Sequence, residues 1–446
     1  MTKKQMHLAF DLSWSHTGGR WRMPGSWVGS QFPDIRMYEE IARIAERGCI
    51  EMIFFGDGSG IPDTWRGSHE EAVRWGIMWP RQDMSPWIAA MSRVTEHVGF
   101  GLTYASTFMH PYYTARLLNS LDILTNGRMA FNVITSTRLS DAANYGFDDL
   151  MDHGARYDRM EEFIDVCRSL WDSVAPDTFI WDRETGVVGD PSKVRRIDHD
   201  GKYFKVRGPL NTMPSPQGRP VLIQAGGSPR GVKASAYFAD HVFGASKPLK
   251  LQAQQRVELD AALRAQGRDP ESVGILWDVL VVVGETSEAA KLHKERLLTA
   301  IPPEAAGAFL SHYAGFDFST LPDRFTLGEV NAAIAAKQAS PAGFVHQLAF
   351  TIGKDTPISR REFFEHGLRD ATGYEHTIAG SAEEVADKFE EIFEATGSRG
   401  GFMIAHPQST PRDLVNIVDF LVPELRRRGR FRTQYTGKTL RENLST

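Results

Sequence analysis

One segment of the sequence has the residue types that bind an anion at the start of a helix: Gln224-Ala225-Gly226-Gly227-Ser228-Pro229-Arg230-Gly231. Ser228 can cap the helix, and Pro229 suits its first position because no N–H is needed there. The glycines let an anion approach bare backbone, and the helix N-terminus offers free N–H groups and the positive end of its dipole. The segment predicts a phosphate site, with a well-capped helix after a tight turn as the alternative.

A second polar group lies where another predicted helix begins, in His153-Gly154-Ala155-Arg156-Tyr157-Asp158. The side chains of His153, Arg156 and Tyr157 are hydrogen-bond donors on one turn. They could hold a second side of the same phosphate or the polar edge of a cofactor. A network that only fixes the start of the helix is the alternative.

Polar side chains also stand in or directly after predicted strands. Asp57 closes one strand, Thr103 lies in the next, and Asn132 interrupts an otherwise apolar third one. A polar residue in a buried strand costs free energy unless it is hydrogen-bonded. Asn132 can offer amide donors and a carbonyl acceptor to the edge of a heterocycle, or it is a satisfied core amide.

Several strong catalytic motifs are missing from the sequence. It has no P-loop and no His-Glu-x-x-His zinc motif, and the serine at 228 misses the nucleophile-elbow spacing by one position. The glycines around Asp57 are followed by a proline and a long loop, which does not fit a dinucleotide fingerprint. We therefore expect no metal site, and hydrolase and P-loop classes are disfavoured.

Short apolar runs alternate with helical patterns, which is typical of βαβ units and a parallel sheet. Eight such repeats predict an α/β fold, a (β/α)8 TIM barrel, with an open doubly wound sheet as the alternative. The predicted strands are Met6–Leu12, Met52–Phe55, Val98–Tyr104, Arg128–Thr135, Val221–Gln224, His241–Gly244, Gly274–Val283 and Gly401–Ala405. The predicted helices begin at Asp34, Ser85, Tyr112, Arg156, Ser228, Leu249, Thr286 and Thr410, the first ending at Arg47 and the last near Arg427.

We expect one domain over residues 1–446, with three insertions at about 58–84, 176–219 and 301–380. The first and third follow strands, and active sites of barrels form from the loops after strands, so both should build the mouth. The middle insertion precedes a strand and should lie nearer the bottom or side. We expect the third insertion to act as a lid, with its tip around Ser311–Asp323.

Charge and composition exclude some partners. The chain has 446 residues, with 51 Lys+Arg against 56 Asp+Glu, so nucleic acid and anionic membranes are disfavoured as partners.

The two cysteines, Cys49 and Cys167, lie in hydrophobic patterns and should be buried thiols. No apolar run approaches the length of a membrane span and no signal peptide is visible, so we expect a soluble, cytoplasmic protein. The basic run Arg426–Arg432 should be a solvated helix end.

Taken together, these motifs resemble the bacterial luciferase-like flavin monooxygenases, in the branch with nitrilotriacetate, dibenzothiophene-sulfone and long-chain-alkane monooxygenases. The resemblance covers nearly the whole chain. Besides the two helix-start motifs, it rests on Phe55-Gly56-Asp57-Gly58, His110-Pro111-Tyr112, Leu121-Asp122, Gly127-Arg128, Asn132-Val133-Ile134-Thr135-Ser136, Gly201-Lys202-Tyr203-Phe204, Pro214-Ser215-Pro216-Gln217 and Phe431-Arg432-Thr433-Gln434-Tyr435.

The resemblance implies a two-component enzyme that uses reduced FMN and dioxygen to oxidise a small organic substrate. A separate NADH-dependent flavin reductase would supply the reduced FMN, and we expect a homodimer or homotetramer. The residues that match flavin-contacting positions of the family are Asp57, Thr103, Asn132, His153, Tyr157 and Ser228. The alternatives are a deazaflavin-dependent hydride-transfer oxidoreductase on the same barrel and a non-catalytic flavin-binding protein.

The candidate substrate-pocket residues are Trp14, His16, Trp79 and Thr137, since their segments belong at the mouth of a barrel. Alkane-type members of the family carry a cysteine near position 14 and a histidine at position 137. These differences predict an altered pocket, in which the indole of Trp14 favours a compact or planar substrate over a long alkyl chain.

Overall fold

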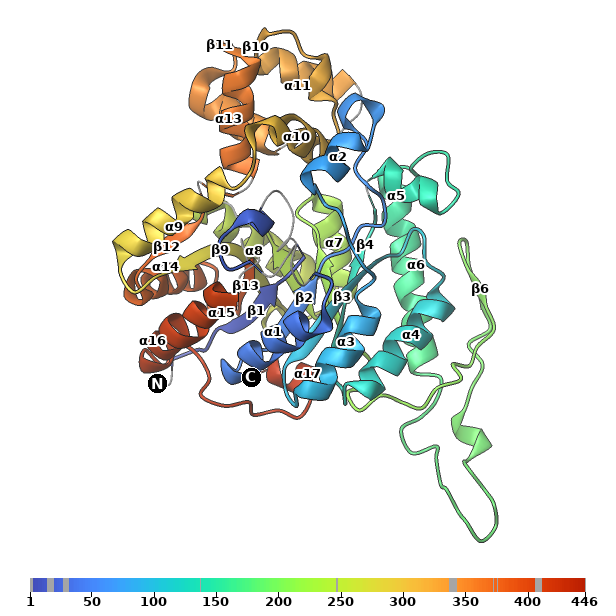
Figure 1. The fold of residues 1–446 in the computed structure, drawn as a ribbon. Coiled ribbons are helices and arrows are strands. Elements are labelled where there is room, and N and C mark those ends of the chain that lie inside the picture. Colours follow the sequence, from blue (N-terminus) through green and yellow to red (C-terminus); the bar gives the residue numbers. More distant parts are fainter. Residues whose placement is uncertain are drawn as a thin grey trace.

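The computed structural model describes residues 3–13, 20–26, 32–136, 138–245, 248–336, 343–371, 373–374, 376–405 and 411–445. Within these residues, eight parallel strands close into a barrel in the order β9-β13-β1-β2-β3-β4-β7-β8, with β8 paired to β9 (Figure 1). The predicted TIM barrel is therefore confirmed. The strands are β1 (His7–Asp11), β2 (Met52–Phe55), β3 (Gly99–Ala105), β4 (Met129–Ile134), β7 (Val221–Ala225), β8 (His241–Gly244), β9 (Gly274–Val283) and β13 (Gly400–Ala405).

Helices surround the barrel, and local signals set their ends. The side chain of Asp34 accepts from the backbone N–H of Arg36 at the start of α1, and Gly48 ends that helix. The helices around the barrel are α1 (Ile35–Arg47), α3 (Ser85–Met91), α4 (Pro111–Leu124), α6 (His153–Trp171), α7 (Pro229–Phe238), α8 (Leu249–Ala265), α9 (Ser287–Thr299), α14 (Ala382–Ala395), α15 (Pro411–Asn416) and α16 (Val422–Arg427). The loop between β4 and α6 carries α5 (Leu139–Asn144).

Two of the predicted helices are less regular than expected. The helix at Ser85 ends at Met91 and continues only as a 3-10 turn over Ser92–Val94. The last helix is interrupted by a π-helical turn over Ile417–Leu421. Pro423 stands two residues after the π-helical turn, and because it has no N–H to bond the preceding turn, it accounts for the break.

The barrel interior changes from apolar to polar toward the carboxyl ends of the strands. Ala9, Ala130 and Leu276 belong to one buried cluster inside the barrel. Because side chains of a strand alternate in direction, the next inward positions above them are Asp11, Asn132 and Asp278. Polar groups therefore line the upper interior of the barrel, where its active site is expected.

The opposite end of the barrel is closed by α17 (Leu440–Asn443), near the C-terminus (Figure 1). Leu440 and Leu444 pack into the same interior cluster as Ala9. A Cβ placed on Gly99 would lie 2.6 Å from a side-chain carbon of Leu440, so the leucine packs directly against this glycine. Side chains of α17 and the residue after it thus fill the barrel interior at the lower end.

The first and third insertions share a second hydrophobic core. Ile77 and Met78 of the first pack in one cluster with Leu310, Phe318 and Phe363 of the third. We call residues 61–84 and 301–371 the lid; it lies above the carboxyl ends of the strands at the top of Figure 1. Its elements are α2 (Glu70–Trp75), α10 (Ala306–Ala314), β10 (Arg324–Thr326), α11 (Leu327–Ala336), α12 (Gly343–Leu348), β11 (Pro357–Ser359) and α13 (Arg360–Ala371).

Two details of the third insertion were predicted wrongly. Ser311–Asp323 was expected at the tip of the lid, but Phe316 and Phe318 are buried in its core because several aromatic rings pack around them. The end of the predicted insertion forms β12 (Ile378–Gly380), which pairs with the extension of β9 beyond the barrel. β9 is long enough to reach both β13 and this added strand.

The middle insertion forms an arm that extends away from the barrel at the lower right of Figure 1. The arm carries the short strands β5 (His199–Asp200) and β6 (Lys205–Val206) and a hairpin in which Ile180 N–H donates to Val188 O over 2.8 Å. Its outer side chains are unusually exposed for apolar residues, with 55% for Ile180, 59% for Trp181 and 50% for Val188. The arm therefore presents an apolar surface to its surroundings.

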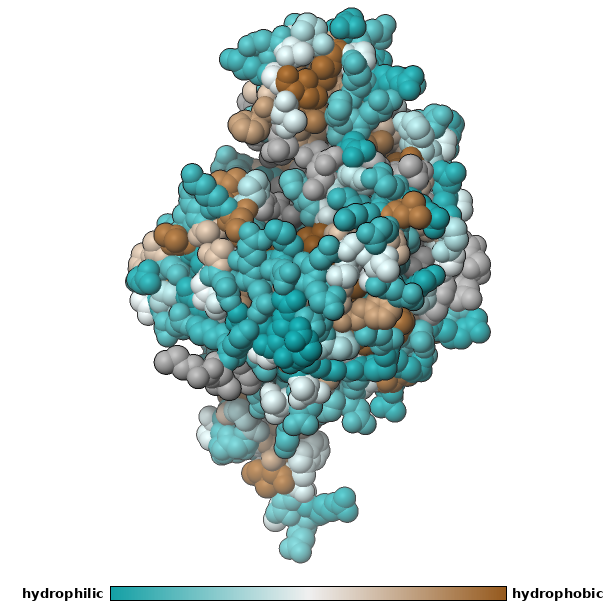
Figure 2. Space-filling view, turned by 90° about the vertical axis from the view of Figure 1, so that its left-hand side faces the viewer, coloured by the Kyte–Doolittle hydropathy of each residue, from teal (hydrophilic) through white to brown (hydrophobic). Residues whose placement is uncertain are grey.

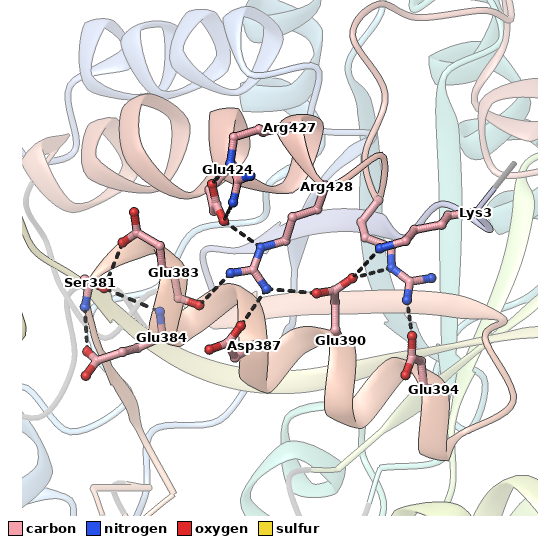
Figure 3. Close-up of polar contacts among 11 residues, drawn as sticks. Lys3, Ser381, Glu383, Glu384, Asp387, Glu390, Glu394, Glu424, Arg427 and Arg428 are labelled. Carbon is pink, nitrogen blue, oxygen red and sulfur yellow. Dashed lines mark hydrogen bonds and ion pairs between the residues drawn. The ribbon is translucent and has the colours of Figure 1, made fainter.

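The basic run at the end of the last helix is not solvated as predicted. Figure 3 shows Arg428 bonded to Glu424 (2.6 Å), Asp387 (2.6 Å) and Glu390 (2.8 Å). Arg430 and Arg432 are only 7% and 5% exposed. Arg428 and Arg430 pair with acidic side chains of α14, so they fasten the end of α16 to that helix, whereas Arg432 pairs with the buried Glu51. The face over these two helices, at the left of Figure 1, is mostly hydrophilic in Figure 2.

Cys49 and Cys167 are both free and buried, as predicted, and burial raises the pKa of each thiol. Among the described residues, no helix has the length and apolar character that a membrane crossing needs.

Candidate active site at the mouth of the barrel

The glycine-rich segment after β7 folds as a capped helix start. Ser228 is the N-cap of α7, and its hydroxyl accepts from the N–H of Gly231 over 3.1 Å. The hydroxyl hydrogen remains to donate to an anion. A Cβ on Gly226 would lie only 2.9 Å from the Cα of Gly231, so the backbone comes close to itself here and needs glycine. This arrangement of donors at a helix N-terminus can bind an anion.

The start of α6 lies next to this turn. The phenol oxygen of Tyr157 is 3.0 Å from the position of a Cβ on Gly231, and the rings of His153 and Tyr157 are 5.1 Å apart. Tyr157, 7% exposed, is buried, whereas His153 is exposed. The structure therefore brings His153, Tyr157 and Ser228 together from two helices.

Two arginines of these motifs have structural partners. Arg230 donates to Glu161 over 2.6 Å and to Asp158 over 2.8 Å, and it lies over the ring of Tyr157. Arg156 donates to the carbonyl oxygen of Ser136 over 3.1 Å, which ties α6 to the loop after β4. The donors left for an anion are thus the hydroxyl groups, the imidazole and the backbone N–H groups.

A second polar group lies inside the upper barrel. The side-chain amide of Asn132 donates to the hydroxyl of Thr103 over 3.0 Å. Asn132 is 4% exposed, and its amide oxygen has no hydrogen-bond partner in the described part of the chain. A buried acceptor without a partner is costly, so this atom is suited to a ligand N–H.

Asp57 follows β2 beside these residues, and it lines a cavity of about 20 Å³ together with Thr103 and Ile134. Its carboxylate accepts from the N–H of Gly58 over 2.7 Å. Burial raises the pKa of Asp57, and the nearby charge of Arg81 opposes that rise. All six predicted cofactor-binding residues lie at one end of the barrel. Three surround the start of α7, where an anion could bind: His153, Tyr157 and Ser228. The other three lie together in the upper barrel: Asp57, Thr103 and Asn132.

Two aspartates in the upper barrel were not singled out from the sequence. Asp11 accepts from the backbone N–H of Ser13 over 2.8 Å and from its hydroxyl, and burial raises the pKa of Asp11. Burial and the charge of Asp11 raise the pKa of Asp278 to about 7. One oxygen of Asp278 has no partner among the described residues. Its place in an apolar strand is the same signal that identified Asn132.

The lid contributes a buried histidine that sequence reasoning also missed. His312, on α10, is 8% exposed, and its Nε2 has no partner within the described ranges. Burial and the charges of Arg138 and Arg81 lower the pKa of His312 to about 3. Its imidazole is therefore neutral at physiological pH and can donate or accept a hydrogen bond. No local motif marks this residue.

Of the four substrate-pocket candidates, Trp14, His16 and Thr137 lie outside the described residues. Trp79 is half-buried in the lid, in the segment before α3. Within the described ranges, no cluster of three or more metal-ligating side chains occurs.

Comparison with known proteins identifies the family. A family model described as luciferase-like monooxygenase matches residues 10–400. The chain is 34% identical over 448 residues to the dibenzothiophene-sulfone monooxygenase of Rhodococcus erythropolis (strain XP), covering 99% of this chain and 97% of that protein. It is 35% identical over 451 residues to nitrilotriacetate monooxygenase component A of Aminobacter aminovorans, covering 99% and 96%.

A solved structure supports the same assignment. The crystal structure of DmoA from Hyphomicrobium sulfonivorans matches with a TM-score of 0.86 and 34% identity, covering 99% of this chain and 92% of that chain. With the barrel and the polar site at its mouth, these similarities show that the chain belongs to the luciferase-like monooxygenase family and is a flavin-dependent monooxygenase.

Proposed function

We propose that this enzyme uses reduced FMN and dioxygen to oxidise a small organic substrate at the mouth of the barrel. The observation that carries the proposal is the pairing of an anion site at Ser228 and Tyr157 with a buried, unpartnered acceptor on Asn132. A ligand with a phosphate at one end and a heterocyclic N–H at the other satisfies both, and FMN has this composition.

The residues present fit FMN as follows. Ser228, Tyr157 and His153 would donate to the phosphate, helped by the N-terminal N–H groups of α7. Asn132 would accept from the ring, with Thr103 fixing the orientation of its amide. Bound reduced FMN would supply the electrons that activate dioxygen. We also propose that Asp57 contacts the flavin ring, as a third residue beside Asn132 and Thr103.

The chain's own residues would control water and protons around the reacting groups. The lid covers the mouth, and excluding water there protects a reactive species from wasteful hydrolysis. His312 reaches the site from the lid as a neutral imidazole, and Asp278 lies in the upper barrel with a pKa of about 7. Asp278 can therefore hold or release a proton near neutral pH.

We also propose that a separate NADH-dependent flavin reductase supplies the reduced FMN, because the sequence has no recognisable dinucleotide fingerprint. The purified chain with NADH and FMN should show negligible loss of NADH absorbance until a reductase is added. Robust NADH oxidation by the chain alone would refute this part of the proposal.

The central test supplies photochemically reduced FMN to the purified chain under air and follows flavin absorbance, dioxygen and hydrogen peroxide. We expect the chain to change the rate of flavin reoxidation, and a substrate to lower the hydrogen peroxide formed per FMN. Reoxidation at the rate of free reduced FMN, with or without the chain, would contradict the proposal. Reoxidation that does not depend on dioxygen would favour a different enzyme class.

The substrate itself does not follow from the relatives, which are named for compounds as different as dibenzothiophene sulfone and nitrilotriacetate. We retain Trp14, His16, Trp79 and Thr137 as proposed pocket residues. Trp14→Ala should raise the Michaelis constant of the substrate and leave FMN affinity nearly unchanged.

We further propose that the enzyme is a homodimer or homotetramer, and that the arm supports this assembly. Two-stranded hairpins are marginally stable alone, and exposed apolar surface of this kind marks protein–protein contacts. Changing Ile180 and Trp181 together to Asp and Glu should shift the sedimentation coefficient toward that of a monomer. A wild-type chain that is already monomeric would contradict the proposal.

A further inference from the structure

Arg138 has an unusual position at the mouth of the barrel. It follows β4 as the N-cap residue of α5 and is half-buried. Its guanidinium lies over the backbone at the end of β2, since a Cβ on Gly58 would be 2.9 Å from its Nη1. In the described part of the chain, the Arg138 side chain forms no hydrogen bond and no ion pair.

A second guanidinium lies beside it. Nη1 of Arg81, from the lid, is 3.4 Å from the same Cβ position on Gly58. The two positive charges repel each other strongly enough that the charge of Arg138 lowers the pKa of Arg81, after the larger effect of burial. Holding two like charges this close in a partly buried site costs free energy, which a bound anion would recover.

The nearby carboxylates form no ion pair with Arg138 in the described part of the chain. Asp141 accepts from the N–H of Gly60 over 2.7 Å and from the hydroxyl of Ser136 over 2.9 Å, so both of its oxygens are bonded elsewhere. Asp57 accepts from the N–H of Gly58, and burial disfavours its charged form. Asp57 and Asp141 act on Arg81, whereas neither forms a hydrogen bond or an ion pair with the Arg138 side chain in the described part of the chain.

The third group is His312, on α10 of the lid, whose imidazole interacts electrostatically with Arg138 and Arg81. It is more than nine-tenths buried, its Nε2 has no partner among the described residues, and it lies within the electrostatic reach of both arginines. A neutral imidazole with an unused nitrogen next to two guanidinium groups can add one more hydrogen bond to an anion.

From this convergence we propose that Arg138, with Arg81 and His312, forms an oxyanion subsite that holds a carboxylate or sulfonate group of the substrate. The inference rests on the proposed function, since it names the class of molecule oxidised there: a small organic anion. Arg138 carries the specificity because a guanidinium binds two oxygens of such a group at once. The subsite is separate from the phosphate donors on α6 and α7.

The test uses three thioethers that differ only in one group: 3-(methylthio)propanoate, 3-(methylthio)propanesulfonate and the neutral 3-(methylthio)propanamide. Binding to the FMN-loaded chain is measured by calorimetry at low and high salt. We expect at least one anion to bind about tenfold or more tightly than the amide. The preference between carboxylate and sulfonate identifies the headgroup.

Arg138→Gln should remove most of this preference and leave FMN affinity unchanged. Arg183→Gln, at an exposed position on the arm, is the matched control and should change neither. His312→Gln, which retains a donor, should keep more of the preference than His312→Phe. The proposal is overturned if neither anion binds saturably, if the amide binds as tightly, or if Arg138→Gln weakens FMN binding instead.

These outcomes are separable from failure of the proposed function. Dioxygen consumption and hydrogen peroxide release with reduced FMN and no substrate should not depend on Arg138, which carries the anion preference. If they proceed while the anion preference is absent, the subsite alone is wrong. If they are absent while the anion binds, the proposed use of reduced FMN is wrong.

Discussion

The side-chain amide of Asn132 donates to the hydroxyl of Thr103 over 3.0 Å, and this bond leaves the amide oxygen of Asn132 buried without a partner in the described chain. Neighbouring positions on β4 and β3 place the two residues opposite each other. Thr103 therefore fixes which side of the Asn132 amide faces a ligand. A structural asparagine would be expected to satisfy both of its ends.

Asn132→Leu removes the unpartnered oxygen while nearly keeping the side-chain volume. We expect FMN affinity to fall about fivefold, since a hydrogen bond is worth about 1 kcal/mol, and thermal stability to stay nearly constant. Fluorescence titration of FMN and a melting curve check both. Thr103→Val should weaken FMN binding less than Asn132→Leu does. The Asn132 amide stays in place and loses only the hydrogen bond that orients it. Unchanged FMN affinity in Asn132→Leu would show that the amide is only structural.

Ser228→Ala should weaken FMN binding about tenfold or more, because one hydroxyl serves both the phosphate and the helix cap. The control is Ser381→Ala, which removes the N-cap serine of α14 away from the site. Both variants should lose similar stability, about 1 kcal/mol, but only Ser228→Ala should lose FMN affinity. Equal FMN affinity in the two variants would contradict the phosphate assignment.

Asp278→Asn should change how stability depends on pH. Burial and Asp11 raise the folded-state pKa of Asp278 from 3.8 to about 7, so its neutral form is favoured in the fold. Its stabilising contribution is complete below the unfolded pKa and is lost as pH rises toward 7. At pH 8 the variant should therefore be more stable than wild type, by an amount on the order of 4 kcal/mol.

Urea unfolding at pH 5 and pH 8 measures this difference. Asp200→Asn, on the exposed arm, should leave the pH dependence as in wild type. If wild type and Asp278→Asn lose the same stability between the two pH values, Asp278 is not a strained buried carboxyl, and its proposed role as a proton holder fails.

Phe318→Ala should loosen the lid without unfolding the barrel, because the lid has its own core. Phe318 is fully buried and packs against Phe316, Phe344 and Phe363, so its loss costs about 3–5 kcal/mol locally. More water should enter the site, and hydrogen peroxide formed per reduced FMN should rise.

Phe350→Ala is the matched control, since Phe350 is 88% exposed on the same lid. It should leave hydrogen peroxide release unchanged. The lid does not exclude water if Phe318→Ala keeps the circular dichroism of the barrel and yields no additional hydrogen peroxide.

The sequence by itself determined the barrel and much of its local detail, because those features depend on neighbouring residues. Apolar runs placed the eight strands, Asp34 and Gly48 set the ends of α1, and Ser228 with Pro229 set the start of α7. Such signals act within one turn or one strand, so they can be read without a fold. The lone polar residue in β4 was found in the same way.

Only the tertiary structure decided which distant residues meet. The two insertions that form the lid share a core because their apolar faces pack against each other. No local sequence pattern predicts this pairing. Asp278 has a high pKa because the closed barrel buries it and brings it near Asp11. Arg428 and Arg430 are paired because α14 lies beside α16. Likewise, Arg138 and His312 converge from β4 and the lid, because long-range packing fixes what each side chain faces.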